Sequence, residues 1–563
     1  MPEYLSPGVF IEELSGPKPI EGVGTSTGAF VGLTARGPIN DPRLVTNMTQ
    51  YADTFGGFNP DFYLPFAVRC FFVEGGTRCF VTRVFRRTAD FDPTITDTTD
   101  PRSDPKLHVA RLQLRVGSSS TSDIALTVFA SSEGLWGNDI SVQVLPAGFI
   151  PPASFDTNAI ADEFQLRVFL KGIPDPVEIY DRLSMAELKN GLPNPNHVEA
   201  RINGVSPYII VKDATNSTTN ITPPFFPVPP LLPTAPTALA NGSDGRSPGT
   251  TSTSLTPSDI IGAEAAGPLK ATGLHAFDAV DDINIVAIPD LVHDAFNKTE
   301  GRTAINDGMT YCQNRQDCFF VADTVAKLSP QQALDYKRGT GSFGGNAFNS
   351  KYGALYYPWI YIANPLDGKL LKVPPSGAVA GSYSASDVRV GVHKAPAGIE
   401  DGYLNSAADI ERVVTKGEHD VLNPQGVNVI RKFADYGIVI YGARTVSSDP
   451  EWKYVNVRRL FIFLEESILK GTQSVVFEPN DFSLWKRITR DISAFLRVQW
   501  SEGKLVGEKA EKAFFVKCDA ETNPPESTDL GRVITLIGVA PSKPAEFVIF
   551  RIRQMKTGGS AVE

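Results

Sequence analysis

The chain has 563 residues, of which 42% are hydrophobic and 21% are charged, and its formal net charge is −10. This length is too great for a single hydrophobic core and predicts about three or four domains. An acidic chain without a long basic run argues against nucleic acid as the main partner, because phosphate binding needs clustered Lys and Arg. The 48 glycines and 43 prolines favour many turns and a mixed or β-rich fold.

Cysteine usage and the first residues bear on where the chain is made. Five cysteines without a CxxC pair are typical of a reducing compartment. The segment Met1–Tyr4 is not a basic stretch followed by apolar residues, so we expect no secretory signal. No run reaches the roughly 18 apolar residues that a bilayer-spanning helix needs. We therefore expect a chain made in the cytoplasm, without direct membrane insertion.

The first element is a short β-prone segment near the N-terminus. Val9 and Ile11 face one side of it, and Phe10 and Glu12 face the other. No second strand follows closely in the sequence. Such a strand is predicted to be disordered or to join another sheet, so we assign residues 1–20 to an N-terminal arm.

Residues 21–90 predict the first part of an α/β core domain. At its end, Arg83, Arg86 and Arg87 form a basic patch, for which a solvated face is favoured over a polyanion site. The predicted elements are a strand at Gly28–Leu33, a helix at Tyr63–Val73 and a strand at Arg78–Val84.

Residues 91–258 predict an inserted, β-rich domain. Within it, residues 214–258 are rich in Pro, Ser and Thr and are expected to be an extended linker, because this composition cannot bury a core. The alternating segments are Leu107–Val116, Asp123–Ala130, Asp139–Leu145, Phe164–Leu170 and Tyr208–Lys212.

Residues 259–440 predict a second α/β stretch that completes the core domain. Its continuous apolar runs suit strands buried on both faces, and the helix between two of them implies a largely parallel, helix-covered sheet. A GxGxxG match at Gly339–Gly344 follows a helix and not a strand, which favours a plain loop over a dinucleotide site. The runs are Ile283–Pro289, Cys318–Asp323 and Tyr356–Ala363, and the helix is Pro330–Lys337.

Residues 441–540 predict a small α+β domain, with strands at Phe514–Cys518 and Val533–Val539. Two amphipathic helices precede these strands. Gly471 is placed to end the first helix, and Asn480 or Asp481 is placed to cap the second. The apolar stripes are Val457, Leu460, Phe461, Leu464 and Ile468 in the first helix, and Leu484, Ile488, Ile492, Phe495 and Leu496 in the second.

Residues 541–563 predict a C-terminal arm in which a proline-bounded linker leads into a strand. Val548, Phe550 and Ile552 face one way, and Phe547 and Ile549 face the other. Both ends of the chain therefore have the pattern of a strand that pairs outside its own domain.

No catalytic constellation, cofactor site or metal site is predicted. The Walker A, HExxH and GxSxG motifs are absent, and the six histidines are scattered. Ser26 follows Gly24 and Thr25 as in a subtilisin nucleophile, but no histidine motif accompanies it. Cys312 and Cys318 fit an apolar role better than metal binding. The carboxylate pairs Asp281–Asp282 and Glu465–Glu466 are expected to be solvated.

Seven segments stand out in order along the chain: Leu5–Glu13, Asp282–Pro289, Leu422–Asn428, Tyr436–Thr445, Asn456–Phe461, Val476–Asn480 and Pro544–Phe547. Together they resemble the tail sheath protein family of contractile phage tails and phage-tail-like contractile injection systems. Tyr441 stands where that family often has tryptophan, and residues 90–258 match nothing firmly, as expected of a variable outward-facing insert.

The resemblance implies a central domain with a subtilisin-like fold that lacks catalysis. It further implies hexameric rings, stacked into a helical sleeve around an inner tube, whose terminal strands add to sheets in neighbouring subunits. The implied partners are the chain itself, the inner tube protein, and baseplate and terminator proteins. The implied location is a phage tail or a tail-like particle made in a bacterial cytoplasm. The basic residues Lys486, Arg487 and Arg490 are possible tube-facing residues, with plain solvent exposure as the alternative.

Two alternatives remain open at this stage. The chain is either a sheath subunit or a sheath-related terminator or baseplate protein, which would form discrete rings without polymerising. The enzyme alternative is a secreted hydrolase with a subtilisin-like core, and it requires a nucleophile next to a histidine.

Overall fold

The computed structural model describes residues 20–85, 109–115, 124–148, 163–185, 188–189, 192–213, 236–245, 247–250, 254–265 and 270–546. Arg86, Arg87, both predicted terminal strands and most of the Pro-rich linker lie outside these residues. The chain forms two compact units. The described part of unit 1 comprises residues 20–25, 386–395 and 454–546, and that of unit 2 lies within residues 26–385 and 396–453.

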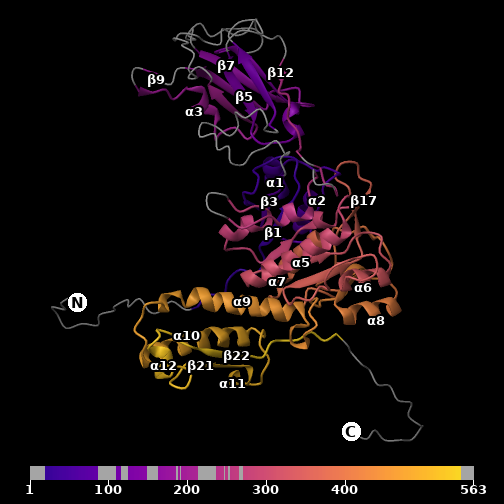
Figure 1. Cartoon of the computed structure of the whole chain (residues 1–563), viewed down its shortest axis with the longest axis vertical. Coiled ribbons are helices and arrows are strands. Elements are labelled where there is room, and N and C mark those ends of the chain that lie inside the picture. Colours follow the sequence, from indigo (N-terminus) through magenta and orange to yellow (C-terminus); the bar gives the residue numbers. More distant parts are fainter. Residues whose placement is uncertain are drawn as a thin grey trace, which may run out of the picture. The chain divides into compact units, whose positions relative to one another are not determined.

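Unit 2 is built on an eight-stranded sheet (Figure 1). The six central strands run parallel, and the edge strands β2 and β20 are antiparallel to their neighbours. Every residue of β1, β14 and β15 is buried, because both faces of the sheet are covered. In sheet order the strands are β2 (Arg43–Val45), β3 (Cys79–Arg83), β1 (Gly28–Gly32), β13 (Ile285–Ala287), β14 (Phe319–Asp323), β15 (Gly353–Tyr357), β19 (Val427–Phe433) and β20 (Gly437–Ile440).

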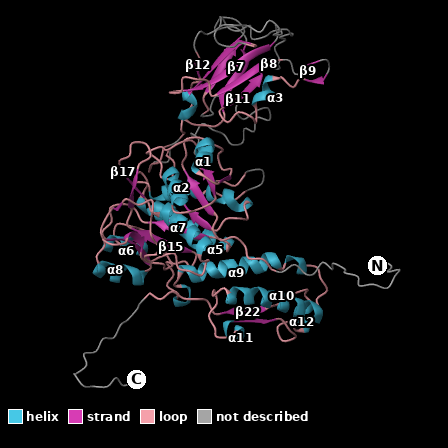
Figure 2. Ribbon diagram, turned by 180° about the vertical axis from the view of Figure 1, so that it is seen from behind, coloured by secondary structure: helices cyan, strands magenta, loops and turns pink. Residues whose placement is uncertain are grey.

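Helices of unit 2 connect these strands, as the alternation of patterns predicts (Figure 2). The predicted loop at Gly339–Gly344 follows α6 and wraps around Arg302, whose guanidinium donates to the carbonyls of Tyr336, Gly344 and Asn346. The helices are α1 (Met48–Phe55), α2 (Leu64–Val73), α4 (Pro257–Ile261), α5 (Lys298–Arg315), α6 (Pro330–Arg338), α7 (Ser376–Arg389) and α8 (Lys416–Leu422). Residues 386–389, at the end of α7, belong to unit 1.

Two local predictions in this unit are wrong. The run Tyr356–Ala363 is not one strand: β15 ends at Tyr357, and β16 (Ile360–Ala363) pairs in a separate antiparallel sheet with β17 (Leu370–Val373) and β18 (Asp409–Ile410). Pro358 lies at the break, where its missing N–H cannot continue a ladder. Arg83 is not solvated, because it is buried and its Nη1 donates to the Gly37 carbonyl at 2.9 Å.

The inserted region forms two antiparallel sheets around one apolar core. All five predicted segments contain strands, and β8 lies between two of them without having been predicted. One sheet has the order β11 (Ile209–Asp213), β5 (Ile124–Ala130) and β4 (Arg111–Arg115). The other has the order β12 (Thr237–Ala238), β6 (Ile140–Pro146), β7 (Glu163–Leu170) and β8 (Glu178–Ser184). The short elements β9 (Leu188–Lys189), β10 (Leu192–Pro193) and α3 (Val198–Ile202) accompany them.

Unit 1 contains the two long amphipathic helices, which lie side by side (Figures 1 and 2). Phe463 of α9 (Val455–Gly471) contacts Phe495 of α10 (Phe482–Ser501), with ring centroids 6.1 Å apart. Gly471 is the last residue of α9, as predicted. The remaining elements are α11 (Ala510–Ala513), β21 (Phe514–Lys517), α12 (Pro525–Thr528) and β22 (Leu536–Val539). No helix within the described ranges is long and apolar enough to cross a membrane.

The second face of α9 differs from the expectation. The sequence predicts a helix with one apolar stripe and a solvated opposite face, on which Glu465 and Glu466 lie. Instead Asn456, Arg459, Glu466 and Ser467 are buried, and Glu466 pairs with Lys470 at 2.6 Å. The reason is that other stretches of unit 1 lie against this face.

The α10 cap provides a test of the fold. Asp481 accepts a hydrogen bond from the Leu484 N–H at 2.9 Å, as the sequence predicts. We expect Asp481→Ala to lower the free energy of unfolding of unit 1 by about 1 kcal/mol, and Asp481→Asn to change it little. Urea unfolding followed by the fluorescence of Trp485 and Trp500 measures this difference, and equal stability of the two variants would contradict the assigned cap.

Candidate functional site

The carboxyl ends of the parallel strands are where α/β enzymes usually place catalytic groups. Here Asp290 follows β13, Asp323 ends β14, and Ser376 begins α7. These three residues are 0%, 3% and 0% exposed. Asp290 accepts the N–H groups of Leu33 at 2.8 Å and of Tyr63 at 2.7 Å. The Asp323 carboxylate accepts the N–H of Ser376 at 2.8 Å.

These contacts give Asp290 and Asp323 a structural role. Each carboxylate holds the backbone of a neighbouring loop or helix start and is buried. Within the described ranges, no histidine bonds to Ser376 or to Ser26, whose carbonyl accepts the Ser384 hydroxyl at 2.9 Å. His293 instead lies 3.2 Å from the Asp61 carbonyl. The described residues therefore do not assemble a serine triad.

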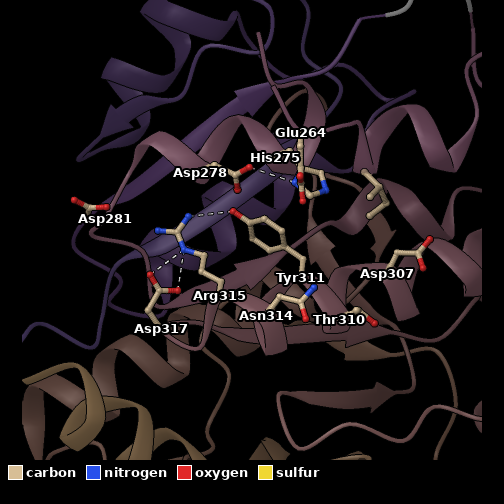
Figure 3. Close-up of a pocket in the computed structure, with 11 residues that line it drawn as sticks. Glu264, His275, Asp278, Asp281, Asp307, Thr310, Tyr311, Asn314, Arg315 and Asp317 are labelled. Atoms are coloured by element: carbon tan, nitrogen blue, oxygen red, sulfur yellow. Dashed lines mark hydrogen bonds and ion pairs between the residues drawn. The ribbon is translucent and has the colours of Figure 1, made fainter. Parts of the chain in front are cut away.

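A pocket of about 670 Å³ lies between α4 and α5 and is strongly acidic (Figure 3). Arg315 bridges Asp317, through Nε at 2.8 Å, and the Tyr311 hydroxyl at 3.0 Å. The His275 ring lies 3.3 Å from Asp278. The carboxylates that line the pocket are Glu264, Asp278, Asp281, Asp307 and Asp317, against the single guanidinium of Arg315.

The chemistry of this pocket is limited by what lines it. The pair formed by His275 and Asp278 has the orientation of a base and its partner, but no serine or cysteine is among the lining residues. Burial raises the pKa of Asp307. In the part of the chain that the structure describes, no three His, Cys, Asp or Glu side chains are arranged to hold a metal ion. The pocket offers charge and no assembled reactive centre.

The start of α9 fastens three separate stretches of chain within unit 1. Arg459 forms two contacts with the Asp387 carboxylate, at 2.9 and 2.6 Å, and its Nη2 also donates to the Thr25 carbonyl at 3.0 Å. The side chains of Arg459 and Asp387 are 3% and 2% exposed. Burial raises the pKa of Asp387 although the Arg459 charge opposes this shift.

Asn456 extends this fastening by one helical turn. Its side-chain amide donates to the carbonyls of His393 at 2.7 Å and of Ser542 at 3.2 Å. The Tyr454 hydroxyl contacts Glu546 at 3.1 Å. Residues 20–25, 386–395 and 541–546 are thus held by one helix, and we refer to this set of contacts as the α9 anchor.

A two-stranded sheet is the second candidate feature of unit 1. Strands β21 and β22 pair antiparallel from Phe514↔Val539 to Lys517↔Leu536. None of their residues is buried, and Phe515 and Leu536 are each 53% exposed. Among the described residues, these strands pair only with each other. The two outer edges therefore offer backbone groups that no described strand pairs.

The predicted tube-facing residues all belong to α10. Arg487 pairs with Glu478 at 3.2 Å, and Arg490 pairs with Asp491 at 2.9 Å. Lys486 is exposed and lies 4.4 Å from the centre of the Phe482 ring. The predicted arm residues Val9, Phe10, Ile11, Glu12, Phe547, Val548, Ile549, Phe550 and Ile552 lie outside the described residues.

The sequence analysis missed the α9 anchor. Asn456 and Arg459 belong to the segment Asn456–Phe461, which carries part of the family resemblance, but neither was assigned a role. The available signal was their spacing, because polar residues three apart lie on one helix face beside the apolar stripe. Asp387 gave no signal, since nothing in the sequence connects it to a helix that begins 68 residues later.

The sequence matches two protein-family models. Residues 264–446 match the phage tail sheath protein central domain, and residues 447–555 match the phage tail sheath C-terminal domain. Together they cover a little more than half of the chain. The chain therefore belongs to the family of tail sheath proteins of contractile phage tails and phage-tail-like contractile injection systems.

Curated relatives share part of this similarity. The tail sheath protein of Enterobacteria phage T4 is 25% identical over 256 residues, which are 43% of this chain and 38% of the relative. That of Vibrio phage KVP40 is 27% identical over 264 residues, or 44% and 38%. In both cases the match spans well under half of the relative's length.

The fold is shared with solved sheath structures. The PVC sheath complex of an extracellular contractile injection system, in its contracted state, superposes with a TM-score of 0.54 at 19% identity, covering 98% of this chain and 99% of that one. At this identity the likeness shows the fold alone. The mixed α/β, multidomain architecture predicted from the sequence is confirmed.

The buried aspartates give unit 2 a pH dependence. Burial raises the pKa of Asp290 to about 6 and that of Asp323 to about 7. Between these values and the usual aspartate pKa of about 4, the folded chain binds more protons than the unfolded chain. Its free energy of unfolding therefore falls as pH rises through this window, by at most about 1.4 kcal/mol per pH unit for each group.

Asp323→Asn tests this linkage, because the amide oxygen still accepts the Ser376 N–H. We expect the variant to show a flatter dependence of stability on pH between about 4 and 7 and no loss of stability at pH 8. Urea unfolding at a series of pH values measures the pH dependence and the stability at pH 8. Asp281→Asn, at an exposed aspartate, is the control. A pH slope identical to that of the unchanged chain would contradict the assignment.

Proposed function

We propose that this chain is the subunit of a contractile sheath. It polymerises as stacked hexameric rings around an inner tube, and the sleeve shortens to drive the tube through a target envelope. Its partners are further copies of itself, the inner tube protein, and baseplate and terminator proteins, in a phage tail or a tail-like particle. The observation that best supports this proposal beyond family membership is the open two-stranded sheet of unit 1.

The two terminal arms supply strands for that sheet. Each outer edge of β21 and β22 can accept one extended segment, and the chain has two β-prone ends, Val9–Glu12 and Phe547–Ile552. With about 0.5–1.5 kcal/mol for each hydrogen bond, one short arm contributes several kcal/mol. Apolar residues such as Val9 and Val548 add a comparable amount by burial. Repeated over many subunits, these joints form a continuous mesh.

The work of the sheath needs no catalysis in this chain. The central α/β domain takes the subtilisin-like fold that the family resemblance implies, with its polar groups committed to structure: Asp290 and Asp323 hold backbone N–H groups in the buried interior. We propose that contraction exchanges one set of contacts between subunits for a more favourable set, releasing energy stored at assembly. No cofactor is required.

The domain assignment made from the sequence stands as part of this proposal. Residues 1–20 and 541–563 are the arms, and residues 441–540 form the C-terminal sheath domain. Residues 21–90 and 259–440 form the core domain, and residues 91–258 are an outward-facing insert. The closed apolar core of the insert supports its treatment as a separate module.

The exposed face of α10 is proposed to face the inner tube. Lys486 carries this proposal best, because Arg487 and Arg490 each have a carboxylate partner within unit 1. A cation over an aromatic ring presents charge and apolar surface together, which suits a protein interface with an acidic partner.

Deletion of residues 1–15 tests the arm proposal. We expect the full-length chain, expressed alone, to form ribbed tubes in negative-stain electron microscopy, and the truncated chain to remain as short oligomers or monomers. Deletion of residues 557–563, beyond the C-terminal strand, is the matched control and should leave the tubes unchanged. Long tubes formed by the chain without residues 1–15 would contradict the proposal that the N-terminal arm joins neighbouring subunits. Discrete rings from the full-length chain would favour the terminator or baseplate alternative.

A charge reversal tests the tube-facing residues. We expect Lys486→Glu combined with Arg490→Glu to leave self-assembly of the sheath unchanged but to yield sleeves without an inner tube when tube protein is co-expressed. Lys512→Glu, on α11 of the same unit, reverses an exposed charge elsewhere and serves as control. Tube-filled sleeves from the double variant would show that this face does not contact the tube.

A further inference from the structure

The first described residues of the chain run along α9 in the direction opposite to the helix. Ile20 lies against Gly471, at the C-terminal end of α9, where a Cβ on that glycine would come within 2.7 Å of the Ile20 side chain. The Val23 N–H donates to the Ser467 hydroxyl at 3.1 Å. The Thr25 carbonyl accepts from Arg459, near the start of α9. Six extended residues therefore cover most of one helix face.

The last described residues lie at the opposite end of the same helix. Ser542 and Glu546 are held by Asn456 and Tyr454, at the N-terminal end of α9. The described part of the chain thus begins at one end of α9 and ends at the other. That helix has 17 residues, a length of about 25 Å.

This arrangement sets the direction in which a pull acts. If both arms are pulled outward, the segment Ile20–Thr25 is loaded along its own length. Its contacts with α9 then resist together, as in shear, and do not open one after another from an end. Arg459 makes the last of these contacts, because it binds both the Thr25 carbonyl and the buried Asp387 carboxylate.

We propose that α9 and the segment Ile20–Thr25 form a tension strut that transmits force from one terminal arm to the other through unit 1. Arg459, Asp387 and Ser467 are its positioning residues. The inference rests on the proposed function of the arms and adds the path that force takes inside the subunit. It accounts for a buried ion pair and a buried serine on a helix that could otherwise have been apolar on this face.

The choice of residue types fits this role. A guanidinium makes two parallel bonds to a carboxylate and still has a donor for the Thr25 carbonyl, whereas a lysine ammonium is a point charge on a flexible stem. Replacing Arg459 also leaves the buried Asp387 carboxylate without its full set of hydrogen-bond donors, which further weakens the contacts between Ile20–Thr25 and α9. Arg459→Lys therefore keeps the positive charge but cannot form the two parallel bonds to Asp387 together with the bond to the Thr25 carbonyl.

Single-molecule pulling on the full-length monomer tests the strut. With handles at the two chain ends, the event of interest is the release of Ile20–Thr25 from α9. We expect Arg459→Lys to shorten the lifetime of this contact at constant force by about tenfold or more, the factor expected for loss of one charge-assisted hydrogen bond. Ser467→Ala, a smaller change that removes the bond to Val23, should shorten it in the same direction and decides the question if Arg459→Lys does not fold.

Arg302→Lys is the matched control, because Arg302 is an equally buried arginine that holds three backbone carbonyls in unit 2. It should leave the release lifetime unchanged with handles at the chain ends. With handles at the exposed residues Gly57 and Asp367 of unit 2, we expect Arg302→Lys to shorten the lifetime of the folded unit under force. Arg459→Lys should leave that lifetime unchanged. A merely structural role of Arg459 would lower the melting temperature without this dependence on pulling geometry.

The outcomes separate the strut from the function of the arms. Release lifetimes of Arg459→Lys and Ser467→Ala equal to that of the unchanged chain would overturn the strut while leaving arm-dependent assembly untouched. Long tubes formed without residues 1–15 would overturn the arm function even if the lifetimes shorten as expected. Shortened lifetimes together with arm-dependent tubes support both.

Discussion

Unit 1 depends on the contact between Arg459 and Asp387, which lie 72 residues apart in the sequence. The same guanidinium also joins the Thr25 carbonyl, 434 residues away. A buried ion pair is a weak source of net stability, since desolvation of both charges offsets their attraction. Its value is geometric: breaking it leaves an unpaired charge in the interior, so the pair favours the one arrangement in which Arg459 reaches both Asp387 and Thr25. Asn456, one turn earlier on α9, extends the same constraint to Ser542. A helix that is polar on a buried face is the consequence.

The other distinctive property of the molecule is what it leaves incomplete. Strands β21 and β22 form a sheet with two open edges in the described part of the chain, a condition that proteins usually avoid by charge, bulges or cover. By contrast, the positions at which an α/β protein would place reactive groups are closed. Asp290 and Asp323 are buried and accept backbone N–H groups, and no serine or cysteine is among the residues that line the acidic pocket between α4 and α5. Both features fit a protein that acts by pairing with copies of itself.

Local patterns in the sequence were sufficient for much of this fold. Continuous apolar runs at Gly28–Leu33 and Cys318–Asp323 predicted strands of the central sheet, because strands buried on both faces carry no alternation. The stripe from Leu484 to Leu496 and the cap at Asp481 predicted α10 because helix periodicity and capping are local properties. Pro358 divided a predicted strand, and this error was avoidable, since a proline seldom sits inside a central strand.

The candidate site was less accessible to sequence reasoning. The burial of Arg459 and Glu466 depends on which distant segments lie against α9, and no pattern within α9 encodes that. An open sheet edge depends on which strands are absent beside it, so the segment Phe514–Cys518 could be predicted as a strand but its open outer edge could not. On α10, the pairing of Arg487 with Glu478 and of Arg490 with Asp491 was likewise not predicted, and the contact of this face with the tube remains a prediction. The arms themselves were predicted by alternation, and their pairing remains a prediction.

The most direct measurement is a cryo-electron microscopy reconstruction of tubes assembled from the full-length chain, at a resolution that traces the backbone. The account predicts that the sheet formed by β21 and β22 gains strands on its outer edges, contributed by the Val9–Glu12 and Phe547–Ile552 segments of neighbouring subunits. A two-stranded sheet in the assembled tube, with both terminal segments bound elsewhere, would contradict it.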